Sequence, residues 1–412
     1  MSVRAKLSST LSSYDQRFWI LFVVQLIVAA GFGAAMPFVS IFLHDVLGVS
    51  MTYVGTIMLV SALVSAAGRV LGGEIADRFG RRPLLIWGMA ARVVAFGMMA
   101  FVIHVRASAL VVGGMFIAVR LVGAMVRPGL SAMVADVVEP SRRVEAYALF
   151  RIGANAGWAI GPAIGGFLVA TSYASLFLLT TFASLIGLVL MIFFTSESIQ
   201  EMETAQFSIR RILDVAHDFR FLVLCGWSVL LFVVMGQFAS TFAVFSTQVV
   251  GIGEPQLGIL FTINGIVVVL FQWPAARLTG RIGIRWGLVL GCLLYALGYF
   301  SVSFAAGLPF LIGSMVLITL GEVTFSPTSM AAVANMAHKE KIGRYMGFFG
   351  LTEALGWSLG PFVGGILFDS LYGTPGVLWG IIAGIGVLAA VGFATTTRDR
   401  HMSLGGDEAG SH

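Results

Sequence analysis

The feature that most constrains this chain is the clustering of its apolar residues into long blocks, each at least as long as the roughly 20 residues that a bilayer core requires. An α-helix of that length covers the hydrocarbon core of a bilayer. Twelve such blocks alternate with charged or turn-rich breaks, at 18–42, 52–76, 83–104, 109–135, 144–170, 173–195, 219–248, 256–276, 286–305, 308–336, 344–369 and 375–395. We therefore expect an all-α integral membrane protein with twelve transmembrane helices.

Composition excludes a water-soluble globule of this size. Hydrophobic residues make up 58% of the chain and charged residues only 11%, whereas soluble domains carry about 25% charged residues. Cys225 and Cys292 lie inside apolar blocks, so we expect inert thiols and no disulfide framework. The sequence has no P-loop and no His/Cys metal spacing. We therefore expect no enzyme activity, no cofactor, no metal site and no nucleic-acid partner.

The basic residues predict the topology. Of the 25 Lys and Arg residues, 19 fall in the termini and in every second loop, while the opposite loops hold only Arg106. Loops rich in Lys and Arg mark the cytoplasmic face. An odd number of helices would scramble this separation. We expect a multi-pass protein of the cell (inner or plasma) membrane with both termini in the cytoplasm.

The chain repeats itself with an offset of 199 residues. GWAIGPAIGG at 157–166 matches GWSLGPFVGG at 356–365, with six of ten positions identical. A repeat of this length in a helical membrane chain predicts two pseudo-symmetric six-helix bundles. We expect an N-terminal bundle at 1–195, a cytoplasmic linker at 196–218, and a C-terminal bundle with a short cytoplasmic tail at 219–412.

The two repeated segments have a mechanical interpretation. Glycines four residues apart leave one smooth helix face, against which a neighbour packs closely or slides. A proline removes a backbone hydrogen bond and favours a bend. Ordinary close packing without a moving part is the alternative interpretation. The predicted helix-bend motif comprises Gly157, Gly161, Pro162, Gly165, Gly356, Gly360, Pro361 and Gly364.

A short loop carries the strongest motif of the chain. Residues 73–85 read GEIADRFGRRPLL, with an acid, a turn glycine and a basic cluster between two predicted spans. This pattern closely resembles the signature loop of the major facilitator superfamily, G-x-L-A-D-R-x-G-R-K-x-x-L. The second half carries a partial copy at 280–285 that lacks the acid. The Gly-Pro segment at 157–166 also resembles the family's antiporter motif, and the chain as a whole is similar to twelve-helix drug–proton antiporters.

The resemblance implies a conformational latch at the cytoplasmic face. Asp77 would lie against the start of the segment 344–369, where a helix N-terminus favours negative charge. Arg81 would pair with Asp136. A loop that is positive only because of topology is the alternative. The residues assigned to the latch are Gly73, Asp77, Arg78, Gly80, Arg81, Arg82 and Asp136.

Charged residues inside the predicted spans are candidates for coupling, because each costs about 2.5–3.5 kcal/mol or more at mid-membrane. Arg92, Arg120, Arg127 and Arg151 lie in the first half, and Glu322 and Glu353 in the second. We expect Arg127 or Arg151 to face Glu322 or Glu353 as a charge gate that protonation opens. Static ion pairs within one half are the alternative. Arg92 is expected to be a packed or snorkelling residue.

Uncharged polar residues complete the candidate site. Because the block 18–42 holds no acid, proton coupling would depend on Glu322, Glu353 or Asp77. Arg120 resembles the basic residue of the family's motif on the fourth helix, although the spacing that follows it differs. The residues expected to line the cavity are Gln25, Arg120, Asn155, Gln237 and Asn264.

Three functions remain open on this basis. The first is proton-coupled efflux of small hydrophobic or amphipathic compounds by alternating access, in a monomer surrounded by membrane lipid. The second is uptake or exchange of an anionic metabolite, which the embedded arginines would suit. The third is a membrane receptor or lipid scramblase without coupled transport, and the intact signature loop argues against it.

Overall fold

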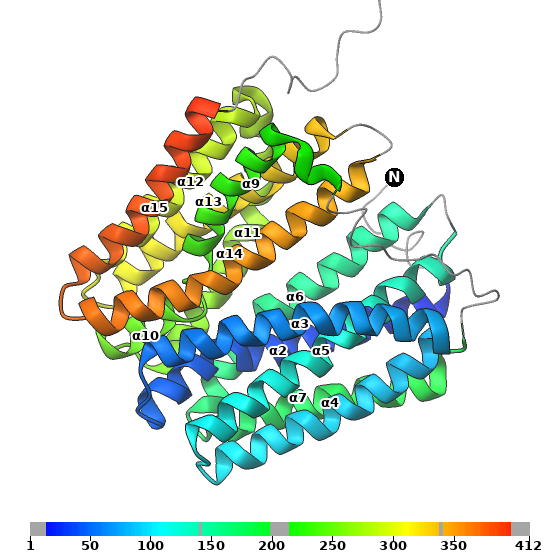
Figure 1. Ribbon diagram of the computed structural model, residues 1–412. Helices are drawn as coiled ribbons and strands as arrows, with labels where there is room; N and C mark the ends of the chain where they lie inside the picture. The colour runs from blue at the N-terminus through cyan, green and yellow to red at the C-terminus, as the bar shows by residue number, and fades with distance from the viewer. Residues whose placement is uncertain (1–13, 140–141, 198–213, 338–340, 397–412) are drawn as a thin grey trace, which may run out of the picture. The chain divides into compact units, whose positions relative to one another are not determined.

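The computed structural model describes residues 14–139, 142–197, 214–337 and 341–396 (Figure 1). Within these ranges the chain forms helices joined by short turns, and no strand is present. Most of the linker predicted at 196–218, and the tail beyond 396, lie outside the described residues. The domain boundaries given above therefore stay a prediction.

Eleven helices in the described ranges are long and apolar enough to cross a membrane. The first six long helices are α2 (Gln16–Ile41, continued by a π-helical turn Phe42–Val46), α3 (Met51–Phe79), α4 (Arg81–His104), α5 (Ala109–Val137), α6 (Arg143–Val169) and α7 (Tyr173–Phe194). The later long helices are α11 (Glu254–Ile282), α12 (Ile284–Val302), α13 (Leu308–Met336), α14 (Ile342–Leu371) and α15 (Pro375–Thr396). Together with a shorter apolar helix, they confirm the twelve-helix fold.

The segment predicted as one helix at 219–248 is broken, which corrects the prediction of a continuous helix there. A short turn of 3₁₀-helix, η3 (Asp214–His217), precedes α9 (Phe219–Met235), and α10 (Thr241–Gln248) follows the break. The break lies at a close contact with α14, where a Cβ atom at Gly236 would lie 3.0 Å from the Cα of Gly360. The Nε2 of Gln237 donates to the carbonyls of Val233 (2.9 Å) and Gly360 (2.8 Å) and satisfies two acceptors at the break.

The helices form two units. Residues up to Val49 and from Val60 to the end of α7 form the first, and Ser50–Leu59 together with the helices from α9 onward form the second. Helix α3 therefore contributes its first turns to one unit and its remainder to the other. Within the first unit α2 packs on α6, and α4 packs on α5 and α7. The second unit repeats these pairs, with α9 on α14 and with α12 on α13 and α15, as Figure 1 shows for α12 and α15.

The repeated glycines make the tightest of these contacts. A Cβ atom at Gly161 of α6 would lie 2.5 Å from the carbonyl oxygen of Ala30 in α2. In the second unit a Cβ at Gly360 of α14 would lie 2.7 Å from the carbonyl oxygen of Val233 in α9. The helices therefore meet backbone to backbone, which only glycine permits. Both helices continue through their prolines, Pro162 and Pro361.

We expect Gly161→Ala to lower the thermal unfolding midpoint of the purified protein. The added methyl group has no space against the α2 backbone, and overpacking of this kind costs about 1–3 kcal/mol. Gly114→Ala is the matched control, because a Cβ at Gly114 of α5 meets nothing within 4 Å. The control should be neutral or slightly stabilising, since alanine favours a helix over glycine. Equal midpoints for the two variants would contradict the packing argument.

Candidate functional site

The signature loop makes a sharp turn between α3 and α4. Gly80 has a φ of 96°, in the left-handed region that favours glycine. A Cβ at this position would also lie 2.6 Å from the Oε2 of Glu197. The carboxylate of Glu197 accepts hydrogen bonds from the backbone N–H groups of Arg81 (3.2 Å) and Arg82 (3.1 Å). Glu197 therefore caps the N-terminus of α4, where negative charge is favourable.

Arg81 joins the start of α4 to the end of α5. Its guanidinium forms an ion pair with Asp136, and its Nη1 donates to the carbonyl of Ala132 at 3.0 Å. The two side chains of the pair are 19% and 21% exposed, so solvent screens their attraction only in part. The predicted Arg81–Asp136 contact is thus present within the first unit. Its role as a latch stays a prediction.

The basic residues of the loop have separate functions. Arg82 donates from Nη2 to the carbonyl of Ile192 in α7, at 2.9 Å. In the second unit Arg285 donates to the carbonyl of Ala394 in α15. The two arginines hold equivalent helices in the two units, so the partial motif at 280–285 keeps a packing function without its acid. Arg78, by contrast, pairs with Glu74 on the exposed face of α3 (2.6 Å).

The latch acid Asp77 is exposed near the end of α3. It lies within electrostatic range of Arg81 and contributes to the field at that guanidinium. Gly73 lies one turn earlier, and a Cβ there would meet nothing within 4 Å. Replacement of Gly73 by alanine should therefore change the stability of the first unit little.

The second unit contains a carboxyl group in a neutral polar setting. The Nδ2 of Asn264 in α11 donates to the carboxylate of Glu322 in α13 (3.0 Å) and to the hydroxyl of Thr319 (2.9 Å). Thr319 in turn donates to the carbonyl of Met315 (2.7 Å). Among the described residues of the second unit, no basic residue contributes to the electrostatic setting of Glu322. Glu322, predicted as a coupling residue, and Asn264, predicted as a cavity residue, are thus in direct contact, and their roles stay predictions.

The other candidate residues are spread over both units. Arg127, Arg151 and Asn155 are exposed, and Gln25 and Glu353 are partly buried. Gln237 is buried; its Nε2 makes two hydrogen bonds at the break after α9, whereas its Oε1 is buried without a hydrogen-bond partner among the described residues. Among the residues that the structure describes, no group of three His, Cys, Asp or Glu side chains could hold a metal ion.

Arg92 and Arg120 lie inside the first unit. Arg92 is 3% exposed, and its guanidinium lies over the ring of Phe96 at 5.0 Å. Arg120 lies over the ring of Phe32 at 5.4 Å. Both arginines have a buried Nε atom without a hydrogen-bond partner. Arg92 is packed as the sequence led us to expect, with a Cβ at Gly123 lying only 2.8 Å from its Nη1.

Sequence reasoning missed Asp369, near the end of α14. Its carboxylate accepts from the backbone N–H groups of Met51 and Thr52, both at 2.8 Å, and from the hydroxyl of Thr52 at 2.6 Å. Asp369 therefore caps the N-terminus of α3 inside the second unit. The sequence did contain a signal for it. An acid near the C-terminus of a helix is unfavourable with the dipole of that helix, so its presence suggests that it binds the N-terminus of another helix.

We expect Asp369→Ala to destabilise the purified protein by about 0.5–2 kcal/mol, the usual effect of removing a helix cap. Three hydrogen bonds to α3 are lost together. The neighbouring Ser370→Ala is the control, because the Ser370 hydroxyl bonds only the Ile366 carbonyl of its own helix. Thermal unfolding in detergent measures both variants. An Asp369→Ala midpoint equal to that of the control would rule out the cap.

Arg69 of α3 and Glu197 were also missed. Arg69 lies inside the block 52–76, and the argument from the cost of embedded charge applied to it as much as to the other arginines. Glu197 lies three residues after the end of α7, and nothing in the local sequence connects it with α4.

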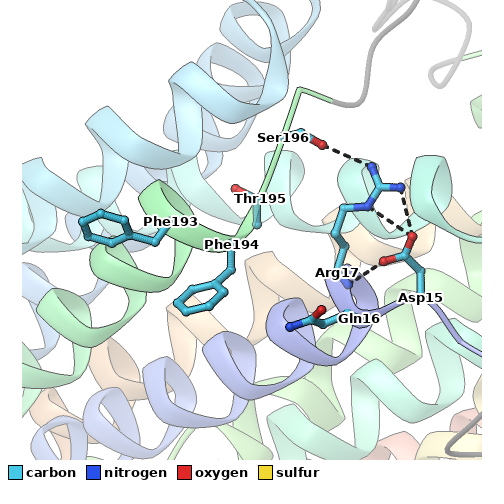
Figure 2. A pocket seen from close by; sticks show the side chains of 7 residues that line it. All are labelled: Asp15, Gln16, Arg17, Phe193, Phe194, Thr195 and Ser196. Atoms are coloured by element: carbon cyan, nitrogen blue, oxygen red, sulfur yellow. Dashed lines mark hydrogen bonds and ion pairs between the residues drawn. The ribbon is translucent and has the colours of Figure 1, made fainter.

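A surface hollow lies where α2 begins and α7 ends (Figure 2). Arg17 donates to the carboxylate of Asp15 (2.9 Å) and to the hydroxyl of Ser196 (3.2 Å). The hydrogen bonds from Arg17 hold the pKa of the Asp15 carboxyl below its ordinary value. Because these groups satisfy one another at the surface, the hollow fixes the start of α2 and carries no argument for a substrate site.

Comparison with known proteins covers nearly the whole chain. The sequence profile described as Major Facilitator Superfamily matches residues 21–253 and again 221–410. The multidrug resistance protein MdtH of Aeromonas hydrophila is 27% identical over 385 residues, covering 90% of this chain and 92% of that protein. The uncharacterized MFS-type transporter YttB of Bacillus subtilis is 28% identical over 386 residues, with coverage of 92% and 93%.

Solved structures share the fold at low sequence identity. The nucleoside transporter NupG superposes with a TM-score of 0.78 at 14% identity, covering 93% of this chain and 99% of that chain. A peptide transporter POT superposes with a TM-score of 0.77 at 16% identity, with coverage of 94% and 95%. At these identities the likeness concerns the fold alone.

Proposed function

Because the chain belongs to the major facilitator superfamily of transporters, we propose that it exports small hydrophobic or amphipathic compounds in exchange for protons. The family implies a multi-pass membrane protein that moves a small-molecule substrate. Relatives that match nine-tenths of the chain carry the name multidrug resistance protein. We further propose an inner-membrane monomer with both termini cytoplasmic, in line with the Lys and Arg distribution of its loops.

The observation that carries the proton proposal is the setting of Glu322. Its carboxylate is held by the neutral amide of Asn264, and no cation of the second unit contributes to its surroundings among the described residues. A carboxylate without a cationic partner is costly inside a membrane, and protonation removes that cost. Glu322 would therefore bind and release a proton as its surroundings change during transport.

The loop and the glycine faces provide the mechanical part of the proposal. Arg81 and Asp136 would close the cytoplasmic side in one state, together with Asp77. Asp369 caps the start of α3, at the end of that helix remote from the signature loop. Because α3 belongs partly to each unit, we propose that this cap is broken and remade in each cycle.

Flux into inside-out proteoliposomes tests the function. Ethidium and 2-naphthoate serve as cationic and anionic aromatic probes, and an acidic lumen supplies the gradient. The proposal expects accumulation of at least one probe, which collapses when the gradient is dissipated. Exchange of 2-naphthoate independent of the gradient would instead favour the anion exchanger. No flux of either probe would favour a receptor or scramblase.

A further inference from the structure

The first unit contains three arginines that lie close together, with no acid paired to them among the unit's described residues. Arg69 belongs to α3, and Arg120 and Arg127 belong to α5. The charge of Arg120 interacts unfavourably with those of both other arginines, and Arg69 interacts unfavourably with Arg127. Because Arg120 and Arg127 are seven residues apart, nearly two helical turns, they lie on the same side of α5. We call these three residues the arginine cluster.

Tight helix packing fixes the cluster. A Cβ at Gly68 would lie 2.9 Å from the carbonyl oxygen of Leu121, and a Cβ at Gly72 would overlap the Met125 carbonyl. The hydroxyl of Ser65 donates to the carbonyl of Arg120 at 3.3 Å. Helices α3 and α5 are therefore in backbone contact around Arg69, which fixes the positions from which the three arginine side chains extend.

No protein anion neutralises the cluster in the described part of the first unit. The ion pairs there involve Arg17, Arg78, Arg81 and Arg142, and none involves the cluster. The Nε of Arg120 is buried and has no hydrogen-bond partner. Like charges repel more strongly where a guanidinium is shielded from water, as that of Arg120 is in part, so a bound counter-anion would stabilise the cluster. Planar guanidinium groups bind carboxylate and phosphate oxygens in pairs.

The cluster also has an aromatic border. The guanidinium of Arg120 lies 5.4 Å from the centre of the Phe32 ring. Phe32 meets Trp158 of α6 edge to face, with ring centres 5.7 Å apart. A ligand whose anionic group reaches the arginines would place its apolar body beside these two rings.

We propose that Arg69, Arg120 and Arg127 bind the anionic group of an aromatic amphipathic substrate, with Phe32 and Trp158 contacting its ring. This inference rests on the proposed efflux function and specifies its substrate class. The anionic group of the substrate can be a carboxylate or a phosphate, because both accept paired hydrogen bonds from guanidinium groups. A free inorganic anion such as phosphate could bind the arginines in the same way, and the test distinguishes it from an aromatic anion.

Equilibrium binding to the full chain in nanodiscs tests the proposal without transport or a gradient. The probes are 2-naphthoate, the neutral 2-naphthamide and inorganic phosphate, each titrated by calorimetry. We expect 2-naphthoate to bind at least tenfold more tightly than either 2-naphthamide or phosphate. Equal affinity for naphthoate and naphthamide would overturn the proposal. Phosphate binding as tight as that of naphthoate would overturn the organic substrate in favour of an inorganic ion.

Substitutions in the arginine cluster test whether it causes the preference for 2-naphthoate over 2-naphthamide. Arg69→Gln should weaken 2-naphthoate binding at least tenfold and leave 2-naphthamide binding unchanged. Arg106→Gln, at an exposed arginine in the turn after α4, is the matched control and should behave as wild type. Arg69→Lys keeps the charge without the planar fork and should retain part of the preference, so the test stands even if Arg69→Gln does not insert.

Stability provides an independent readout. Because removing one of three repelling charges relieves strain, ligand-free Arg69→Gln should unfold at the same temperature as wild type or higher. A lower midpoint together with unchanged naphthoate binding would show that acids elsewhere in the chain neutralise the cluster, and would overturn the proposal. Normal binding without gradient-driven flux would instead refute the efflux function and leave the anion site standing.

Discussion

Glu322→Gln should reduce gradient-driven transport at least tenfold while substrate exchange without a gradient continues. Glutamine has the shape of the protonated side chain and can still bond Asn264, but it cannot release a proton. The variant is therefore fixed in the neutral form, which the membrane favours by about 2.5–3.5 kcal/mol or more over a charged group. The substrate site remains intact, so exchange of internal for external substrate needs no change at residue 322.

The measurement compares accumulation driven by an acidic lumen with counterflow at equal pH, in the same proteoliposomes. Glu322→Asp is the control, because it keeps a titratable group on a shorter side chain and should retain part of the driven transport. Full gradient-driven accumulation by Glu322→Gln would show that Glu322 does not carry the proton. Glu353 and Asp77 would then be the remaining acids proposed for coupling.

Asp136→Asn should lower the rate of transport at least tenfold. The same substitution should lower the thermal unfolding midpoint only modestly. The substitution removes the ion pair that joins the start of α4 to the end of α5 and leaves the partly buried guanidinium of Arg81 without its anion. Leaving one partner of a partly buried bond unsatisfied costs about 1–3 kcal/mol. If this contact closes the cytoplasmic side, its loss destabilises one of the two states that transport requires.

Transport rate and thermal midpoint are measured together for this variant. Glu74→Gln is the control for stability, since its pair with Arg78 is exposed and such pairs contribute about 0–1 kcal/mol. Arg81→Gln should have the same effect as Asp136→Asn, and the double variant should be no worse than either. A wild-type transport rate in Asp136→Asn would show that the Arg81–Asp136 contact stabilises the fold but does not act as a latch.

The sequence predicted the twelve-helix fold well because several independent features of the sequence indicate the same fold. Block length, the side preference of basic residues and the 199-residue repeat each indicate twelve helices, and one failure would not have changed the result. The break after Met235 was not predictable in this way. The break coincides with the contact of Gly236 with Gly360, which are far apart in the chain, and the polar Gln237 and Ser240 at the break are too few to end an apolar block of this length.

Residues of the candidate site were predictable only where the residue type alone, such as a charged residue inside an apolar block, indicates a function. Embedded charge singles out Glu322, Arg120 and Arg127 without knowledge of their neighbours. The pairing of Glu322 with Asn264 depends on the packing of α11 against α13, which no local pattern encodes. The caps provided by Glu197 and Asp369 join residues more than a hundred positions apart. Such contacts follow from the tertiary fold rather than from spacing.

Coupling in the reverse direction is the most direct test of the proton-exchange account. Proteoliposomes containing a pH-sensitive dye are loaded with whichever of ethidium and 2-naphthoate the protein accumulates, and are diluted into probe-free buffer at the same pH. The account predicts that protons enter the vesicles as the probe leaves, and that Glu322→Gln abolishes this proton movement. Probe efflux through the wild-type protein with no change in luminal pH would contradict it.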